Sequence, residues 1–127
     1  MEKLVLVFIG GGGGAVARYL VGQQALRLVG PGWPSGTLAV NIVGGLLMGL
    51  LAGYFAHRGG PHQHAWTLFL GVGVLGGFTT FSAFSLETVL MIQRKAYAPA
   101  LIYATASVGL AIVALWVGLM ISRRAFA

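Results

Sequence analysis

The sequence predicts an all-α membrane protein in which four transmembrane helices form one domain over residues 1–127. Three observations support this fold class. Hydrophobic residues make up 57% of the chain and charged residues only 8%, whereas about 25% of the residues in an average soluble domain are charged. Pro and polar clusters divide the apolar sequence into stretches of about 20 residues or more, the length that crosses a bilayer as a helix. Lys and Arg stand singly or in pairs between these stretches, as they do beside membrane spans.

The spans are predicted at about residues 3–28, 35–56, 65–92 and 97–121. A Gly- and Pro-rich segment, residues 30–34, closes the first span, and the polar segment 57–62 closes the second. Basic residues follow the third and the fourth. Because the connections are short, consecutive helices are expected to be antiparallel neighbours.

Composition and motif context exclude several classes of protein. The net charge of +6 is not gathered into a patch that binds nucleic acid, and no cysteine is present to form a disulfide. Gly10, Gly12 and Ala15 match the G-x-G-x-x-A pattern of dinucleotide sites. That pattern needs an acidic residue about 20 positions later, and the only acidic residues are Glu2 and Glu87. The glycines therefore indicate helix packing, and we expect no enzyme activity.

Three histidines lie close together in the sequence, at His57, His62 and His64. Imidazole is a common metal ligand, but no carboxylate lies nearby in the sequence. We expect these histidines to be solvated residues of the second connection and not metal ligands.

The basic residues are distributed almost evenly between the two sides of the membrane. With four spans, the N-terminus, the second connection and the C-terminus share one side, which carries Lys3, Arg58, Arg123 and Arg124. The other side carries Arg27, Arg94 and Lys95. Because the excess of Lys and Arg sets the orientation of a chain, this near balance predicts insertion in both orientations. Oppositely oriented copies can then pair as an antiparallel dimer.

Glycine accounts for 21 of the 127 residues, and many glycines fall inside the predicted spans. In membranes, small residues allow two helices to approach closely. Gly45, Gly49 and Gly53 recur every fourth residue on one face of the second span. This repeat predicts a tight packing seam.

The middle of the third span contains two pairs of residues that weaken a helix, Gly76-Gly77 and Thr79-Thr80. An unwound segment at membrane depth is tolerated only where it is buried in protein or lines water. Its freed carbonyl oxygens are suitable ligands for a hard cation, as at the discontinuous helices of transporters. The alternative is an unbroken helix that packs through its small residues.

Weak hydrogen-bond donors and two phenylalanines are predicted at similar depth. Asn41 in the second span must find partners inside the membrane, and the spacing of Phe81 and Phe84 places them on one face. Hydroxyl groups are contributed by Ser82, Ser85 and Ser107. Amides and hydroxyls donate hydrogen bonds and ring edges are weakly positive, so this set suits an anion that must enter and leave. The alternative is that the phenylalanines only pack.

Two charged residues fall inside the predicted spans. Arg18 in the first span is costly there, so it either serves function or intersubunit structure or snorkels toward the interface. Glu87 in the third span supplies the carboxylate that a proton-coupled small-molecule exporter of the small-multidrug-transporter type requires. That exporter is the alternative function, and a structural membrane subunit without transport is a third.

At these residues the sequence resembles the Fluc (CrcB) family of fluoride channels. The matching blocks occur in order over nearly the whole chain. They are Gly10-Gly11-x-x-Gly14-Ala15-x-x-Arg18-Tyr19, then Gly36-Thr37-Leu38-Ala39-Val40-Asn41, then Gly76-Gly77-Phe78-Thr79-Thr80-Phe81-Ser82-Ala83-Phe84-Ser85-x-Glu87. The family usually has Thr at the position of Ala83, and some relatives have a hydroxyl at the position of Ala111. A polar track with fewer hydroxyls is therefore expected here.

The resemblance implies a channel that exports F⁻ passively across the inner membrane of a prokaryote and so relieves fluoride toxicity. It implies an antiparallel, dual-topology homodimer with two pores and no other protein partner. A structural Na⁺ at the dimer centre would be held by backbone carbonyls of Gly76 and Thr79. Phe81 and Phe84 would line the fluoride pathway edge-on, beside Asn41. The resemblance assigns further residues less specifically. They are the polar pathway residues Thr37, Ser82, Ser85 and Ser107 and the vestibule or structural residues Arg18 and Glu87.

Overall fold

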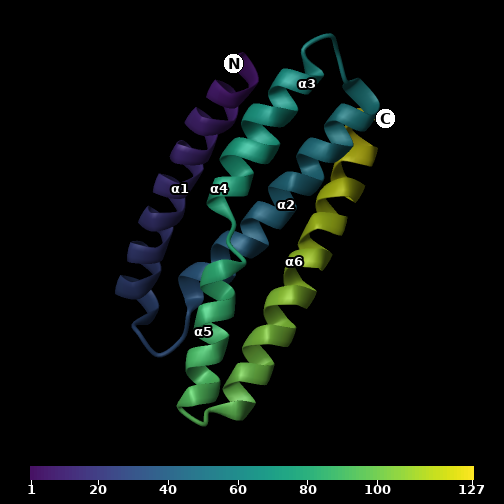
Figure 1. Ribbon diagram of the computed structural model, residues 1–127. Helices are drawn as coiled ribbons and strands as arrows, with labels where there is room; N and C mark the ends of the chain where they lie inside the picture. The colour runs from purple at the N-terminus through teal and green to yellow at the C-terminus, as the bar shows by residue number, and fades with distance from the viewer.

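The computed structural model describes residues 1–127 and contains helices and their connections only (Figure 1). The elements are α1 (Glu2–Val29), α2 (Ser35–Arg58), α3 (Gln63–Trp66), η1 (Thr67–Leu75), α4 (Gly76–Phe78), α5 (Ser82–Gln93) and α6 (Tyr97–Phe126). Four helical stretches are long and apolar enough to cross a membrane, and the third of them comprises α3 to α5. The prediction of an all-α chain with four long apolar helices is confirmed, and the chain is a multi-pass membrane protein.

The helices extend beyond the apolar spans expected from the sequence. α2 continues to Arg58 and α6 to Phe126, and the third stretch begins at Gln63. Hydropathy marks the thickness of the hydrocarbon core, whereas backbone hydrogen bonding continues into the interface until the chain turns. His57 and His64 therefore lie in helices and not in the connection, although all three histidines are exposed as expected.

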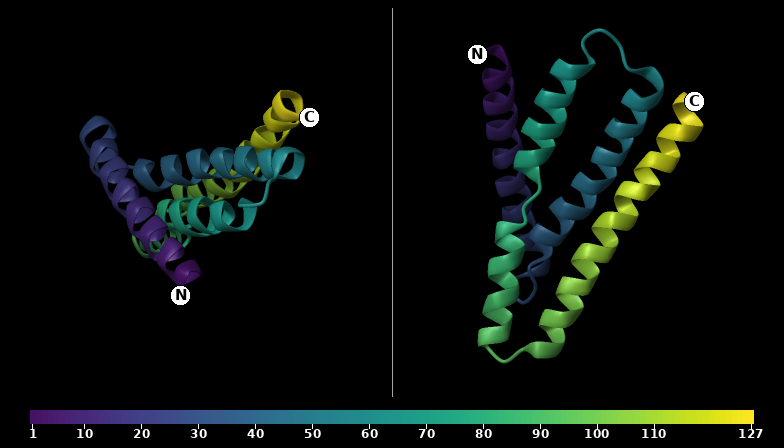
Figure 2. Two further views of the ribbon diagram at one scale, coloured as in Figure 1. Left: turned by 90° about the horizontal axis from the view of Figure 1, so that it is seen from above. Right: turned by 45° about the vertical axis from the view of Figure 1, so that its right-hand side comes forward.

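The two ends of the bundle agree with the predicted sidedness. Figure 1 shows the N-terminus, the α2–α3 connection and the C-terminus at one end, and the α1–α2 and α5–α6 connections at the other. The most extensive helix pair is α2 with α6, and α1 packs along η1 and α4. The views in Figure 2 show the two helices of each pair lying side by side. The chain is thus two helix pairs joined through the third span.

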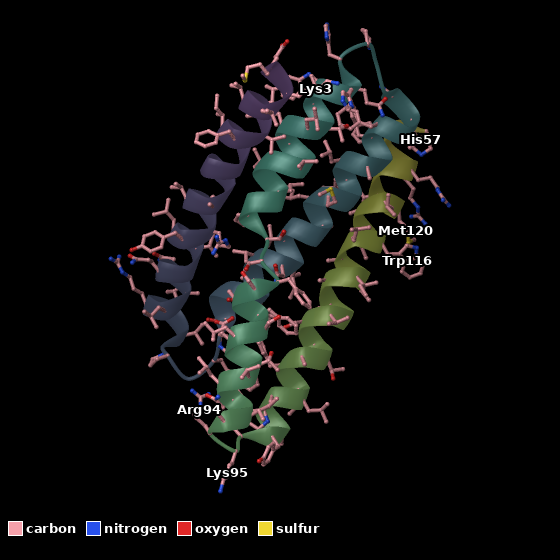
Figure 3. All side chains as sticks on the ribbon, in the orientation of Figure 1. Lys3, His57, Arg94, Lys95, Trp116 and Met120 are labelled. Atoms are coloured by element: carbon pink, nitrogen blue, oxygen red, sulfur yellow. The ribbon has the colours of Figure 1, made fainter.

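Very little of the chain is buried. Only 16 of 127 residues are buried, which is too few for the interior of a soluble domain of this length. Trp116, which is 63% exposed, and Met120 project outward from α6 (Figure 3). Lys3 and His57 lie at one end of the bundle and Arg94 and Lys95 at the other (Figure 3). The apolar surface between these polar ends must be covered by lipid or by protein.

The glycine repeat of α2 forms the tight packing seam that the sequence predicted, and its partner is α6, which the sequence did not indicate. A Cβ atom at Gly45 or Gly49 would collide with a backbone carbonyl of α6, and one at Gly53 would collide with Ser122. The hydroxyl of buried Ser122 donates to the carbonyl of Leu50 at 2.7 Å. Backbone thus packs directly on backbone along this seam.

A second glycine seam joins α1 to η1. A Cβ atom at Gly14 would collide with the carbonyl of Val74, and Gly10 lies against Gly73. η1 is a π-helix of 9 residues, longer than the single-turn π-bulges usually found inside α-helices. Nothing in the sequence indicated this π-helical segment.

Candidate functional site

The third span is interrupted in the middle of the bundle. α4 ends at Phe78 and α5 begins at Ser82, and Thr79 has extended backbone with φ −86° and ψ 161°. Figure 1 shows the backbone crossing from α4 to α5 without a helical turn. Gly76 and Gly77, which were expected to weaken the helix, stay helical in α4. A Cβ atom at Gly77 would collide with the backbone of Gly11, so this glycine serves close packing on α1.

Asn41 of α2 holds the interrupted segment through two hydrogen bonds. Its Nδ2 donates to the carbonyl of Thr80 at 2.9 Å, and its Oδ1 accepts from the N–H of Thr80 at 2.8 Å. The amide thereby satisfies both backbone groups of a residue that has left the helix, which is what a buried interruption requires. One N–H of the Nδ2 group remains free of these bonds.

Arg18 of α1 reaches the same segment from the opposite side. Its Nε donates to the carbonyl of Gly77 at 3.1 Å, and the side chain is half-buried. Arg18 therefore does not simply snorkel toward the interface, because its guanidinium group bonds to the last turn before the interruption. The positive charge faces the end of a short helix, where backbone carbonyls lack partners.

Two carbonyls at the interruption have lost the partners that a continuous helix would give them. Gly76 O would accept from the N–H of Thr80, but that N–H donates to Asn41. Thr79 O would accept from the N–H of Ala83, but that N–H donates to Oγ1 of Thr80 at 3.1 Å. These are the two carbonyls that the resemblance assigns to Na⁺. Free carbonyl oxygens are the ligand type that a hard cation prefers, so the donor set fits the ion.

Three aromatic rings follow the interruption. The ring centroids of Phe81 and Phe84 are 5.4 Å apart with a 52° angle between planes, and those of Phe84 and Tyr103 are also 5.4 Å apart. Phe84 is buried, whereas Phe81 is 75% exposed although it lies in the middle of a span. The tilted rings direct edges as well as faces toward their neighbours.

A groove of about 380 Å³ brings four of the predicted pathway residues together, namely Asn41, Phe81, Phe84 and Ser107, with Thr79 and Thr80 of the interruption. The Oγ atom of Ser107 is buried and has no hydrogen-bond partner. A buried hydroxyl without a partner is costly, and this atom is therefore available to bond a guest in the groove. Ala111 also lines the groove and adds no hydroxyl.

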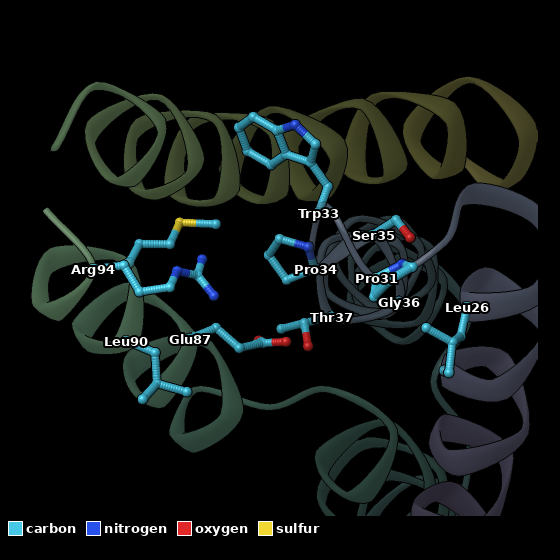
Figure 4. Close-up of a pocket in the computed structure, with 13 residues that line it drawn as sticks. Leu26, Pro31, Trp33, Pro34, Ser35, Gly36, Thr37, Glu87, Leu90 and Arg94 are labelled. Carbon is cyan, nitrogen blue, oxygen red and sulfur yellow. The ribbon is translucent and has the colours of Figure 1, made fainter. Parts of the chain in front are cut away.

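Two further cavities lie between this region and the end of the bundle that carries Arg94, and neighbouring cavities share the lining residues Thr80 and Thr37. A cavity of about 270 Å³ is lined by Arg18, Thr37 and Thr80, and one of about 340 Å³ is lined by Thr37, Glu87 and Arg94. Figure 4 shows the side chains of Thr37 and Glu87 pointing toward one another. Glu87 is half-buried and accepts a hydrogen bond from the hydroxyl of Tyr103 at 3.1 Å.

The remaining predicted hydroxyls contribute less to these cavities. Ser85 donates to the carbonyl of Phe81 at 2.9 Å, one turn back at the start of its own helix, and Ser82 is exposed beside Thr80. Tyr103 was not singled out from the sequence, although it precedes Ser107 by about one helical turn on the same face. The Thr80 hydroxyl was also missed, and the signal was a hydroxyl residue two positions before the first residue of α5, where capping side chains are favoured.

The comparisons with known proteins assign the family. The sequence model of a family described as "CrcB-like protein, Camphor Resistance (CrcB)" matches residues 5–119. Proteins named "Fluoride-specific ion channel FluC" from Phenylobacterium zucineum and Caulobacter vibrioides are 64% and 61% identical to this chain over 127 residues, the full length of both. One of the same name from Mesorhizobium japonicum is 51% identical, covering 97% of this chain and 98% of that protein. The chain therefore belongs to the CrcB family, as its three sequence blocks indicated.

Proposed function

We propose that this protein is a fluoride-selective channel. The observation that carries the proposal is the groove in which the Asn41 amide, the rings of Phe81 and Phe84 and the unpartnered Ser107 hydroxyl meet. These groups offer hydrogen bonds and ring edges without a fixed cation, which permits an anion to bind and to leave. The full-length relatives named fluoride-specific ion channels support F⁻ as that anion.

The conducting unit is proposed to be an antiparallel, dual-topology homodimer with two pores. Phe81 is 75% exposed and most of the apolar surface is uncovered, so one chain leaves the groove open on one side. A second copy closes it without a further protein partner. The near balance of basic residues supports opposite insertion of the two copies.

A structural Na⁺ is proposed at the centre of this dimer. The carbonyls of Gly76 and Thr79, freed at the interruption, would hold the ion, with both copies contributing. When bound, the cation would neutralise the oxygen dipoles of the unwound segments. Arg18 already occupies the neighbouring Gly77 carbonyl, so this carbonyl is not among the proposed ligands.

Export is proposed to be passive and to occur across the inner membrane of a prokaryote; the relatives named above are bacterial. HF enters a cell as a neutral molecule and dissociates in the more alkaline interior, and the channel returns F⁻ down its electrochemical gradient. No energy-coupled step is needed. The cavity between Thr37 and Arg94 would serve as a vestibule.

The test is anion efflux from liposomes that contain the purified protein, read with fluoride and chloride electrodes in parallel. We expect rapid F⁻ release with negligible Cl⁻ release. Phe81→Ile and Phe84→Ile should each reduce F⁻ efflux, with Phe8→Ile as a matched control because Phe8 is an exposed phenylalanine of α1. Folded wild-type protein that releases no F⁻ would refute the proposal.

The alternative, a proton-coupled exporter, is kept by the position of Glu87 in a cavity beside Tyr103. A Glu87→Gln variant separates the two functions. Loss of transport driven by a pH gradient, with no F⁻ conductance in the wild type, would favour the exporter. Wild-type F⁻ efflux that persists without any proton gradient would favour the channel.

A further inference from the structure

We propose that Thr80, with Asn41, is a positioning residue that keeps open the two carbonyls of the central cation site. The inference rests on the cation site of the proposed function and deepens it. Both side chains act on backbone N–H groups and do not contact the ion. Each side chain accepts an N–H that would bond to one of these carbonyls in a regular helix. The carbonyl therefore stays available to the cation.

The Thr80 hydroxyl governs the carbonyl of Thr79. Its Oγ1 accepts the N–H of Ala83 at 3.1 Å, three residues ahead, as the hydroxyl of an N-cap residue does. It also lies 3.3 Å from Oγ of Ser82, to which its own proton can point. Without this cap, the N–H of Ala83 would have the carbonyl of Thr79 as its nearest helical acceptor, four residues back.

Asn41 governs the carbonyl of Gly76 in the same manner. Its Oδ1 accepts the N–H of Thr80 at 2.8 Å, and this N–H is the one that α4 would otherwise use to continue by another turn. Its Nδ2 fixes the other side of the same peptide unit. The Asn41 side chain therefore binds the backbone of Thr80, and the Thr80 hydroxyl binds the N–H of Ala83 in α5.

The two diversions explain why the interruption does not close into a continuous helix. Thr79 and Thr80 are ordinary L-residues without a positive φ angle, so the backbone here has no steric reason to avoid helix. Loss of either acceptor would let the helix recover a bond at the cost of a cation ligand. The cation and the helix compete for the same oxygen atoms.

The test compares Thr80→Val with Thr80→Ser in purified full-length protein. Valine matches threonine in shape but lacks the acceptor, whereas serine keeps it. The readout is the unfolding temperature as a function of Na⁺ concentration, with N-methylglucamine replacing Na⁺ at constant ionic strength. The Na⁺ midpoint is the Na⁺ concentration at half of the rise in unfolding temperature. We expect it to increase about tenfold or more in Thr80→Val, as is typical when a residue that orients metal ligands is lost. In Thr80→Ser we expect it to stay within about threefold of the wild-type value.

A role in stability alone would give a different result. It would lower the unfolding temperature of Thr80→Val equally with and without Na⁺ and leave the midpoint in place, which overturns the inference. Equal midpoint shifts in the valine and serine variants overturn it too. If Thr80→Val does not fold, Asn41→Leu gives the same test for Gly76, with Gly109→Ala as a control because no atom lies within reach of a Cβ atom at that position. Leucine removes the acceptor of the Thr80 N–H, so only Asn41→Leu should raise the midpoint.

Fluoride efflux measured on the same wild-type preparation keeps the two proposals separate. If the wild-type protein conducts F⁻ but its unfolding temperature does not depend on Na⁺ concentration, the positioning role is refuted and fluoride conduction is supported. Protein that shows the expected Na⁺ midpoints but releases no F⁻ supports the positioning role and refutes the channel.

Discussion

The α2–α6 seam and the interruption between α4 and α5 are built from similarly small residues and yet differ in how their backbones are satisfied. In the seam, Gly45 and Gly49 let two uninterrupted helices touch. At the interruption, backbone groups leave the helix and side chains from other helices replace the lost bonds. Small residues alone therefore permit close packing, whereas polar side chains decide where a membrane helix opens.

The largest effect is expected in the seam. Gly49→Ala places a methyl group where the carbonyl of Leu115 lies, and forcing extra volume into a packed site costs about 2–3 kcal/mol. Unfolding in mixed micelles titrated with SDS measures this loss. Gly109→Ala is the matched control, because no atom lies within reach of a Cβ atom at that position of α6. Equal stability of both variants would contradict the close approach.

Asn41→Leu is expected to have the next largest effect, at the interruption. The substitution keeps the branched shape of the side chain but removes both hydrogen bonds to Thr80, and stranded backbone groups of this kind cost about 2 kcal/mol of unfolding free energy. F⁻ efflux should fall in the same variant, because the amide lines the groove. Stability unchanged in the SDS titration would show that Asn41 does not hold the segment.

Arg18 tests whether the interruption needs a donor or a charge. Arg18→Met removes the bond from Nε to Gly77, and we expect a loss of about 1.5 kcal/mol because the bond involves a charged donor. Arg18→Gln lacks the charge but carries an amide nitrogen the same number of bonds from Cα as Nε. The SDS titration should therefore place Gln between Met and the wild type. Identical results for Gln and Met would show that the charge alone matters.

The smallest effect is expected at the polar contact of the seam. Ser122→Ala removes one hydrogen bond to the carbonyl of Leu50, and bonds of this type between membrane helices contribute about 0.6 kcal/mol. Leu50 O keeps its helical partner, so nothing is stranded. Ser85→Ala is the control, because the Ser85 hydroxyl bonds within its own helix. A loss as large as that of Asn41→Leu would remove the contrast between the two regions.

The architecture could be predicted from the sequence because it depends on local signals. Long apolar stretches, short connections and the glycine repeat of the second span predicted four helices and a tight packing seam on α2, but not α6 as the partner in that seam. The Thr79-Thr80 pair predicted the place of the interruption, since hydroxyl side chains compete with the helix for backbone groups. Asn41 was selected because a buried amide at mid-span must find partners, and Phe84 because its spacing from Phe81 places both rings on one face beside hydroxyl groups.

The rest depends on contacts between distant residues. The bond from Arg18 to Gly77 joins residues 59 apart in the sequence, and nothing in either neighbourhood indicates it. Gly77 was expected to weaken the helix but instead packs on α1, because the absence of a side chain lets it approach the backbone of Gly11. The π-helical segment η1 likewise lies against α1 through Gly10 and Gly73. The roles of these glycines follow from their neighbours.

The seam between α2 and α6 contains no group that gains or loses a proton. Gly45, Gly49, Gly53 and Ser122 are all neutral at any pH that a cell meets, and no ion pair lies there for salt to screen. A protein whose two ends face compartments of different acidity and ionic strength thus has a stretch of helix contact, from Gly45 to Gly53, whose packing depends on neither. Arg18 and Glu87 lie outside this stretch, at the interruption and beside Tyr103.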